Sequence, residues 1–496
     1  AAASAYALLA GWGVPAQRTL GMIAGVALLR SLGLRWPLPL VLLAAAVGVT
    51  AFDPWALLQP GFWLSFVAVG LLIVSEPGTG RAPPARGWPA RAVAALCGGL
   101  RTQLVATIGL APLTLVFFNQ ISLVGFAANL VAIPVVGLLV TPLALLGMLW
   151  PPLWTPDAAL VHALMAWLAW LAASPLAVWS TAAAPLWAVA AGLCAGLLAV
   201  LPLPWRLRAL ALPLMLPLLW PAVERPAPGR FETVAADIGQ GTAVLVRTAR
   251  HLLVYDAGPQ YSLQADAGER VLLPLLRARG ERHIDLLLLS HRDTDHVGGA
   301  AALVNGLPVR ALASSLADDH PLRASGLPHR RCVAGQAWTW DGVRFEVLHP
   351  LSEDYARARK PNALSCVLRV QGAGAALLLT GDIEAAQEAA LLARGAALKS
   401  EVLLVPHHGS KTSSTPAFVD AVAPRVAVVQ AGWSNRFGHP APEVLARYVE
   451  RGIAIVRSDR CGAWTLPAGA APERAAVCER QVARRYWHHE VSASGS

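Results

Sequence analysis

The chain has 496 residues, of which 55% are hydrophobic and 14% are charged. In a soluble domain about a quarter of the residues are charged, so this composition excludes a wholly soluble protein and indicates a membrane protein with more than one domain. The formal net charge of +10 suits a polyanionic partner or an anionic membrane surface, although basic membrane loops account for it equally well.

The charges divide the chain into two halves. The first 222 residues hold nine of the 40 basic and three of the 30 acidic residues. We therefore predict a membrane domain over residues 1–222, a linker "VERPAPGR" over 223–230, a soluble domain over 231–466 and a polar tail over 467–496. The opening "AAASAYALLAGWG" lacks the basic region of a signal peptide, so we expect the C-terminal portion of a longer protein.

Eight apolar stretches of the first half are candidate membrane crossings. A full crossing needs about 20 apolar residues, so we expect the shorter stretches to be tilted, kinked or re-entrant. Prolines interrupt several of them, which is tolerated where the broken backbone packs in protein or lines a cavity. The stretches are 20–33, 37–51, 61–75, 102–118, 121–150, 158–173, 185–203 and 207–221.

Two groups of arginines set the predicted orientation. Basic residues favour cytoplasmic loops, so the loop 76–101 and the turn near residue 207 are expected in the cytoplasm. Four of the apolar stretches lie between them, and one further crossing then places everything after Ala222 outside the cytoplasm. This order requires 121–150 to cross once, because a re-entrant pair would reverse the side. The arginines are Arg81, Arg86, Arg91, Arg101, Arg206 and Arg208.

Three polar residues interrupt the apolar helices that we expect here, namely Asn119, Gln120 and Asn129. Polar groups inside a membrane segment mark either a transport path or a hydrogen bond between helices. We take the three as candidate channel residues, with the interhelical bond as the equal alternative.

The second half changes to short β-like runs with helix-like patterns at 269–279, 298–304, 384–394 and 441–451. Many strands with a few helices predict an αββα sandwich, an α/β fold in which helices cover the outer faces of two sheets. The runs are "FETVAADI", "TAVLVRT", "HLLVYDAG", "IDLLLLS", "VRFEVLHP", "SCVLRV", "AALLLTGD", "EVLLVPHHGS", "VAVVQAG" and "IAIVRS".

The six cysteines contain no CxxC pair, which argues against a zinc ribbon. Cys97 and Cys194 lie in apolar segments, where we expect core packing. The other four lie in the soluble half, where a disulfide is open but unassigned. They are Cys332, Cys366, Cys461 and Cys478.

Metal-binding side chains gather at the end of one apolar run. "IDLLLLS" is typical of a buried strand, and "SHRDTDHVGG" then places His291, Asp293, Asp295 and His296 in the turn into a helix. A turn can bring four side chains to one point, whereas a straight strand points alternate residues to opposite faces. Buried charges are costly unless they are paired or bind a metal, so this cluster predicts a metal site.

Two later runs also stop at residues that ligate metals. "ALLLTGD" ends at Asp382, and "EVLLVPHHGS" contains His407 and His408. Three such strand ends at one sheet edge would build a dinuclear site in which Asp382 bridges the metals. Two divalent ions about 4 Å apart can stabilise the attacking and leaving oxygens of a phosphoryl displacement.

Two loops near these residues can contact a phosphate. "HHGSKTSS" supplies Ser410, Lys411, Thr412 and Ser413, with an ordinary polar loop as the equal alternative. His439, in "GWSNRFGHPAPEVL", can serve as a general acid or as a phosphate contact. We assign catalytic roles to Asp295, Lys411 and His439.

The second half resembles the metallo-β-lactamase fold superfamily over residues 230–466. "VYDAGP", with Asp256 and Gly258, is similar to its early structural motif, and "SHRDTDHVGG" is similar to its HxHxDH motif with Asp293 as the second ligand. The resemblance implies two metal ions. Their ligands would be His291 and Asp293 for one ion, Asp295 and His296 for the other, Asp382 as the bridge, and His407 or His408 to complete the set.

Two departures from the superfamily bear on the metal. Asp293 replaces an imidazole with a carboxylate, and the further His expected before the bridging Asp has no obvious counterpart. Among the histidines, His349 at a strand end is the best candidate, although a loop histidine is the favoured explanation. An oxygen-rich site suits harder ions, so we predict two divalent ions, either Mn²⁺ or Zn²⁺. The candidates for the open position are His320, His329, His349, Asn362 and Ser365.

The order of the two halves narrows the resemblance to ComEC-type competence proteins. "DIGQGTAVLV" after a multi-span region is similar to that family, and so are "ALLAGWGVPAQRTLGM", "LLQPGFWLSFVAVG" and "FFNQISLVGFAANLVAIPVV". The resemblance implies an inner-membrane channel that imports single-stranded transforming DNA, fused to a metal-dependent nuclease that degrades the other strand. The implied partners are DNA, the inner membrane, a DNA receptor, a translocase ATPase and single-strand-binding proteins.

Two other functions stay open. A membrane-anchored metallo-phosphoesterase acting on a small or lipid phosphate would need fewer apolar stretches. A DNA channel with a non-catalytic, DNA-binding metallo-domain would not need a nearly complete set of ligands. We therefore predict a DNA channel with a phosphodiesterase domain on the periplasmic or extracellular side of the plasma membrane.

Overall fold

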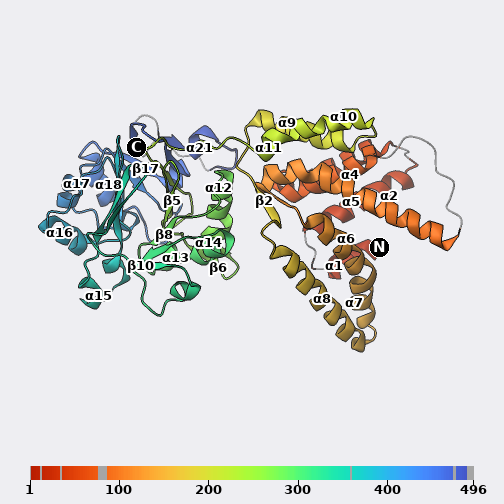
Figure 1. Cartoon of the computed structure of the whole chain (residues 1–496), viewed down its shortest axis with the longest axis horizontal. Coiled ribbons are helices and arrows are strands. Elements are labelled where there is room, and N and C mark those ends of the chain that lie inside the picture. The colour runs from red at the N-terminus through yellow and green to blue at the C-terminus, as the bar shows by residue number, and fades with distance from the viewer. Residues whose placement is uncertain are drawn as a thin grey trace. The chain divides into compact units, whose positions relative to one another are not determined.

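The computed structural model describes residues 2–9, 11, 14–33, 36–75, 87–357, 360–472 and 476–488. The chain forms two compact units, Ala1–Ala222 and Val223–Ser496, which are described separately (Figure 1).

The first unit is helical and contains one short β-ribbon. Proline occupies the first turn of several helices, where its missing N–H would have no partner in any case. The helices are α1 (Ala2–Leu9), α2 (Val14–Ser31), α3 (Leu38–Phe52), α4 (Pro60–Ser75), α5 (Trp88–Phe118), α6 (Gly125–Val135), α7 (Thr141–Gly147), α8 (Trp154–Ala172), α9 (Leu186–Val200), α10 (Trp205–Ala209) and α11 (Ala211–Leu219).

Within the described residues, two helical stretches are long and apolar enough to cross a membrane, Trp88–Phe118 and Gly125–Gly147. The second is continuous because a π-helical segment, Val136–Val140, joins α6 to α7. That wider turn lies between Pro134 and Pro142, which cannot donate the usual helical hydrogen bonds. Shorter apolar helices are Thr19–Leu29, Leu38–Phe52, Pro60–Ser75 and Leu186–Val200. The number of crossings stays a prediction.

The predicted cytoplasmic loop 76–101 is wrong in extent. Helix α5 already begins at Trp88, so Arg91 and Arg101 lie on a helix rather than in a loop. The Arg101 guanidinium donates to the backbone carbonyl of Ser75, the last residue of α4, as cations do at helix C-termini. Arg81 and Arg86 lie outside the described residues.

Two of the candidate channel residues do not lie in a helix as expected. Asn119 ends α5 with a φ of 53°, a left-handed conformation that asparagine tolerates. Gln120 begins the strand β1 (Gln120–Ser122), which pairs with β2 (Val178–Ser180). Asn129 does lie in α6. A channel role for the three stays a prediction.

The second unit is a four-layer sandwich, which confirms the predicted αββα fold. One sheet has the order β10 (His329–Arg331), β9 (Leu312–Ser314), β8 (Leu286–Leu289), β5 (Leu252–Tyr255), β4 (Val244–Arg247), β3 (Glu232–Ala235), β18 (Trp464–Leu466) and β19 (Val477–Cys478). The other has the order β11 (Ala337–Trp340), β12 (Val343–His349), β13 (Val367–Gln371), β14 (Ala376–Leu379), β15 (Val402–Leu404), β16 (Val426–Val429) and β17 (Ala454–Arg457).

Helices cover the outer face of each sheet (Figure 1). The first sheet packs against α12 (Leu273–Ala278) and α14 (Ala300–Gly306), and the second against α16 (Ala385–Ala393), α17 (Pro416–Val422) and α18 (Pro442–Val449). Short helices α13 (Thr294–Val297), α15 (Asp354–Arg357), α19 (Ser458–Cys461) and α21 (Glu479–Val482) complete the unit.

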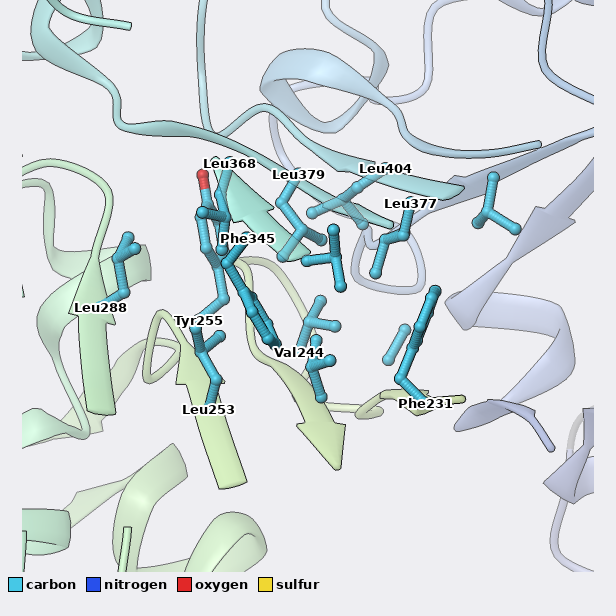
Figure 2. Close-up of a cluster of buried hydrophobic side chains, with 14 of the residues drawn as sticks. Phe231, Val244, Leu253, Tyr255, Leu288, Phe345, Leu368, Leu377, Leu379 and Leu404 are labelled. Atoms are coloured by element: carbon cyan, nitrogen blue, oxygen red, sulfur yellow. The ribbon is translucent and has the colours of Figure 1, made fainter. Parts of the chain in front are cut away.

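The continuous apolar runs form strands that are buried on both faces. In β5, Leu253 and Tyr255 face the space between the sheets, whereas Leu252 and Val254 face the covering helices. Figure 2 shows Leu253 and Tyr255 on the inner face, with Phe345 of the opposite sheet near them. Two buried faces explain why these strands lack the apolar–polar alternation of a half-exposed sheet.

The expected linker and tail both belong to the second unit. The linker's Arg225 forms an ion pair of 2.5 Å with the buried carboxylate of Glu281. The predicted polar tail, 467–496, adds β19 to the edge of the first sheet beside β18. The polar composition of the linker and the tail gave no sign of the ion pair or of the strand pairing, because both contacts depend on tertiary structure.

Four cysteines form two disulfides, Cys332–Cys366 and Cys461–Cys478. Cys97 and Cys194 are free, and both are exposed on helices of the first unit rather than packed in a core. Separations of 34 and 17 residues gave no sequence signal for the pairing.

We expect peptide mapping of the purified, non-reduced chain to recover these two disulfides. Alkylation without reductant should modify Cys97 and Cys194 alone, because the other four sulfurs are already bonded. Alkylated Cys332 or Cys461, or a link that exchanges their partners, would contradict the structure.

Candidate metal centre

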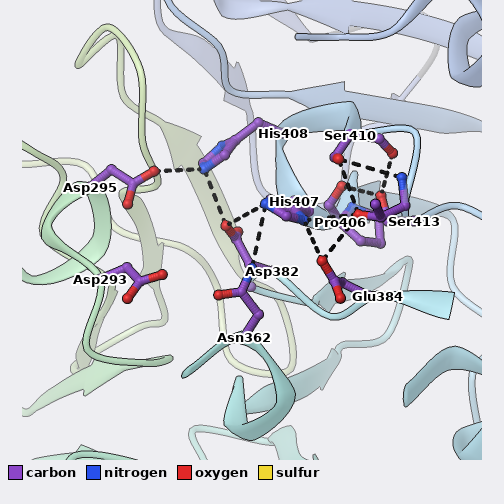
Figure 3. A network of polar contacts seen from close by, with 12 residues as sticks. Asp293, Asp295, Asn362, Asp382, Glu384, Pro406, His407, His408, Ser410 and Ser413 are labelled. Atoms are coloured by element: carbon purple, nitrogen blue, oxygen red, sulfur yellow. Dashed lines mark hydrogen bonds and ion pairs between the residues drawn. The ribbon is translucent and has the colours of Figure 1, made fainter. Parts of the chain in front are cut away.

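Four side chains of the second unit converge between the two sheets. One ligand atom from each of Asp295, His296, Asp382 and His408 lies within 4.8 Å of every other. The His296 Nε2 is 3.1 Å from Asp382 Oδ1, and the His408 Nε2 is 3.3 Å from Asp295 Oδ2. Figure 3 shows Asp295, Asp382 and His408 pointing toward one another.

The sequence led us to expect that the strands preceding these residues end at the edge of one sheet. The structure shows instead that they belong to two sheets. β8 precedes Asp295 and belongs to the first sheet, whereas β14 and β15 precede Asp382 and His408 and belong to the second. The site is therefore built across the sandwich, from the ends of strands in both sheets. Each sheet supplies part of the ligand set, so the centre depends on the packing of the two sheets.

Local backbone geometry places the ligands in both turns. After β8 the chain enters α13, which carries Asp295 and His296 and is followed by Gly298. A Cβ atom at Gly298 would lie 2.2 Å from the backbone nitrogen of Gln260, so only glycine allows this close packing of the turn. After β15 the residues His407 and His408 have φ values of 50° and 54°, which non-glycine residues seldom adopt. Such strain is typical of functional sites, where it fixes the direction of a side chain.

Hydrogen bonds orient the two imidazoles so that their Nε2 atoms face the cluster. The Nδ1 of His296 lies 2.8 Å from Asp256 Oδ2, and the Nδ1 of His408 lies 2.9 Å from the Gln430 carbonyl oxygen. Both acceptors require a proton on Nδ1, so Nε2 is the nitrogen that carries a lone pair whenever the ring is neutral, as it is when a metal binds. This is the usual arrangement around histidines that bind a metal.

The polar atoms that face the centre are buried and form no well-aligned hydrogen bond, although each imidazole nitrogen has a carboxylate within ion-pair distance. They are the Nε2 atoms of His291, His296 and His408 and the Oδ1 of Asp382. Buried polar atoms are nearly always paired, and leaving one unpaired costs about 1–3 kcal/mol, so such a group needs a reason. Lone-pair donors gathered at one point fit a divalent cation, and the residues present therefore match the metal that the fold implies.

Opposite charges control ionisation in the cluster. Burial disfavours a charge on each group, yet His296 and His408 hold the pKa of Asp382 well below its usual value. Burial likewise opposes charging of His296, but Asp382 and Asp256 outweigh it and raise the His296 pKa well above the usual value. The pKa of Asp295 falls to about 2, because His408 and His296 overcome its burial. Imidazolium protons thus stand where a cation would bind.

His291 and Asp293 lie beside this group as a pair. The His291 Nε2 is 3.5 Å from Asp293 Oδ2, and the rings of His291 and His296 are 4.1 Å apart at their centroids. Within the described residues, the four-residue group is the one set of three or more such ligands. A second ion at His291 and Asp293 stays a prediction.

The sequence left the choice between His407 and His408 open, and the geometry distinguishes them. His408 belongs to the four-residue group, whereas the His407 Nε2 lies 3.7 Å from Asp382 Oδ2. The other His407 nitrogen lies 3.6 Å from Glu384, and Asn362 approaches within 3.4 Å of the Nε2 (Figure 3). His407 therefore lies at the border of the cluster.

None of the three candidate histidines reaches the open ligand position. The His349 Nε2 lies 2.9 Å from the Ala363 carbonyl, outside the group. His320 accepts a hydrogen bond from a backbone N–H, and His329 contacts the hydroxyl of Ser314. Ser365 does reach the site, because its Oγ accepts from the Asp382 backbone N–H at 3.1 Å and lies 3.4 Å from the His291 Nδ1.

The loop after His408 provides fewer phosphate contacts than expected. Ser413 is wrong as a contact, because it is buried and its hydroxyl donates to the Pro406 carbonyl at 2.8 Å. Ser410 is also buried and lies 3.1 Å from the hydroxyl of Thr412. Lys411 and Thr412 are exposed, so they remain candidates for contact with a substrate.

His439 lies next to the centre, with its ring centroid 5.8 Å from that of His407 and 6.4 Å from that of His408. Partial burial, together with the charges of His408 and His407, lowers the pKa of His439 to about 4. The ring is therefore neutral at pH 7, which favours a hydrogen-bonding contact over a general acid.

Sequence reasoning missed two residues that organise the centre. Asp256 was taken as part of a structural motif, yet it accepts hydrogen bonds from His296 and from both the backbone and hydroxyl of Ser290. Gln430 orients His408 through its carbonyl, and its side chain donates to the carbonyls of Ala236 and Ala243, which flank β3 and β4 of the other sheet. Asp256 and Gln430 each follow an apolar strand directly. A polar residue at the end of an apolar run is the same signal that identified Asp382 from the sequence.

Two family models match the chain, Competence protein over residues 1–206 and Metallo-beta-lactamase superfamily over residues 236–433. The chain is 36% identical to "Competence protein ComA" of Neisseria gonorrhoeae over 97% of its length. It is 32% identical to "Uncharacterized protein YcaI" of Escherichia coli over 98%, and 28% identical to "Recombination protein 2" of Haemophilus influenzae over 89%. It spans 66%, 63% and 59% of these relatives, less than two thirds of their length.

The contact between Asp256 and His296 yields a prediction about metal affinity. Asp256→Asn weakens the acceptor that holds the His296 Nδ1 proton, so we expect divalent-metal affinity to fall about 10- to 100-fold. Isothermal titration calorimetry on the full chain in detergent measures this. Asp341→Asn is the matched control, because Asp341 contacts His251 at 3.0 Å outside the cluster. Equal affinities for wild type and Asp256→Asn would contradict the assignment.

Proposed function

We propose that this chain, in which a Competence domain precedes a metallo-β-lactamase domain, takes up DNA and hydrolyses phosphodiesters. Its first domain would pass a single strand through the membrane, and its second would degrade the strand that is not imported. The observation that carries the hydrolytic part is the convergence of four ligand atoms in the second domain. Three of the four residues, His296, His408 and Asp382, contribute a buried atom without a well-formed hydrogen bond.

The four-residue group would hold one divalent ion, and His291 with Asp293 would contribute to a second. A bound divalent ion polarises a phosphoryl oxygen and provides a nucleophilic water at neutral pH. The protein orients this chemistry, because Asp256 and Gln430 fix the two imidazoles before any substrate arrives. Three carboxylates among the candidate ligands favour Mn²⁺ as strongly as Zn²⁺.

Groups around the centre suit a phosphodiester. Lys411 and Thr412 are exposed on the loop that carries His408, where an ammonium and a hydroxyl can contact a phosphate oxygen. His439 is neutral at pH 7 and would donate or accept a hydrogen bond there.

The two disulfides support a location of the second domain outside the cytoplasm. Reducing systems keep cytosolic thiols free, whereas disulfides persist in the periplasm and at cell surfaces. All four cysteines of the second unit are paired. A nuclease in that compartment would meet incoming duplex before the membrane passage, in agreement with the orientation expected from the arginines.

We expect the purified full chain to cleave DNA in the presence of Mn²⁺ or Zn²⁺ and to stop when the metal is chelated. Asp382→Ala should lower the rate at least about 100-fold, because no neighbour replaces a carboxylate that faces both His296 and His408. Asp318→Ala is the matched control, since Asp318 is exposed and bound to Arg323 and Arg331. Normal cleavage by Asp382→Ala would refute the proposed site.

The orientation is tested with a cysteine at Leu263, which is 97% exposed in the second unit. In a Cys97→Ser, Cys194→Ser background, we expect Leu263→Cys to react with a membrane-impermeant maleimide on spheroplasts. Lysed cells provide the reference for complete labelling. Labelling only after lysis would place the domain in the cytoplasm.

A further inference from the structure

The segment 432–439, "GWSNRFGH", connects β16 to α18 and borders the metal centre. We call it the aromatic loop. Its last residue, His439, packs against His407 and His408, and the ring of Phe437 stacks on His439 with centroids 5.8 Å apart. A contiguous row of rings therefore runs from the candidate ligands to the protein surface.

The side chain of Asn435 holds the aromatic loop in one conformation. Its Nδ2 donates to the carbonyls of Gly432 at 2.9 Å and His439 at 2.6 Å. Its Oδ1 accepts from the backbone N–H groups of Phe437 and His439. Outside the loop, Gln240 accepts from the Gly432 N–H at 3.1 Å. A loop ordered in advance binds a ligand without a further entropic cost.

The rings of this loop remain accessible. Trp433 is 54% and Phe437 is 53% exposed, although Phe437 stacks on His439, which contacts His407 and His408. The guanidinium of Arg436 lies 4.8 Å from the Phe437 ring centroid, so a positive charge accompanies the ring.

This combination matches the chemistry of an unpaired nucleic-acid strand. Every base offers a π-face to an aromatic ring, and an arginine can neutralise the adjoining phosphate. In a duplex the base faces are already stacked on one another and cannot stack on a protein ring. Exposed aromatic rings therefore favour binding of a single strand over a duplex. The position next to a site for phosphodiester hydrolysis favours this occupant over a lipid surface.

We propose that the aromatic loop is a base-stacking subsite for a single strand of nucleic acid. Phe437 and Trp433 stack on bases next to the phosphodiester at the metal centre, and Arg436 contacts a backbone phosphate. The subsite selects for strandedness and not for sequence, because stacking is tolerant of base identity. This inference rests on the proposed phosphodiesterase function and specifies its substrate.

The test measures binding separately from cleavage. Fluorescence anisotropy of the full chain in detergent, with EDTA present so that no strand is cut, gives the Kd for labelled oligothymidylate. An abasic strand of equal length and a duplex are the comparison ligands. The variants are Phe437→Ala, Phe437→Tyr, which keeps a ring, and Tyr486→Ala, which removes a 78% exposed ring outside the loop.

We expect Phe437→Ala to raise the Kd for oligothymidylate about tenfold, the usual size of one lost stacking contact. Phe437→Tyr and Tyr486→Ala should stay within about twofold of wild type, because stacking does not require a particular ring. On the abasic strand the wild type should bind more weakly, and Phe437→Ala should have no further effect.

Several results would overturn the subsite. An equal loss on the strands with and without bases would mean that Phe437 acts through charge or folding. An unchanged Kd, with lost binding to phosphatidylglycerol vesicles, would make the loop a membrane contact. If the chain binds the strand through Phe437 but cuts no phosphodiester, the subsite stands and the proposed hydrolysis fails. If it cuts DNA and Phe437→Ala binds normally, the subsite alone fails.

Discussion

The contacts of Asp382 with His296 and His408 are the interaction on which the second domain depends. They bring the carboxylate of one sheet against an imidazole of the other, in a region where water is excluded. A buried ion costs several kcal/mol unless it is paired, and removal of one partner leaves the others uncompensated. Two neighbouring side chains hold the cluster in place. The Ser365 hydroxyl accepts a hydrogen bond from the Asp382 N–H, and the Asp256 carboxylate contacts the His296 ring.

The positions of these charged side chains also depend on the hydrophobic core between the two sheets. Tyr255 lies in the inner layer of the first sheet, and its hydroxyl donates to the Cys366 carbonyl at 2.6 Å. Cys366 follows Ser365 directly and is bonded to Cys332, so a covalent link supports the residue that contacts Asp382. The positions of the ligands are thus determined by inner-layer packing and by a disulfide as well as by their own turns.

Errors in the sequence prediction occurred where a contact joins distant segments. The continuous apolar runs identified ten strands, because burial on both faces leaves a strong local signal. Five short strands of the two sheets escaped, since their pairing partners rather than their composition make them strands; they are β9, β10, β11, β18 and β19. Ser413 differs for a local reason, because its hydroxyl donates to the carbonyls of Pro406 and Ser410, which the turn itself brings near.

The sequence by itself determined the division into an apolar and a polar half, the four-layer fold and the residues that can bind metal. These features are local, because they depend on hydrophobic periodicity and on ligand-type residues that follow buried strands. The tertiary structure alone decided that the ligands come from two sheets, that His408 rather than His407 joins the four-residue group, and that Asp256 and Gln430 orient the imidazoles. It also decided the pairing of the cysteines. The physical reason is that hydrogen bonds and metal geometry depend on distances between atoms, and residues far apart in the chain reach those distances only when the two sheets pack.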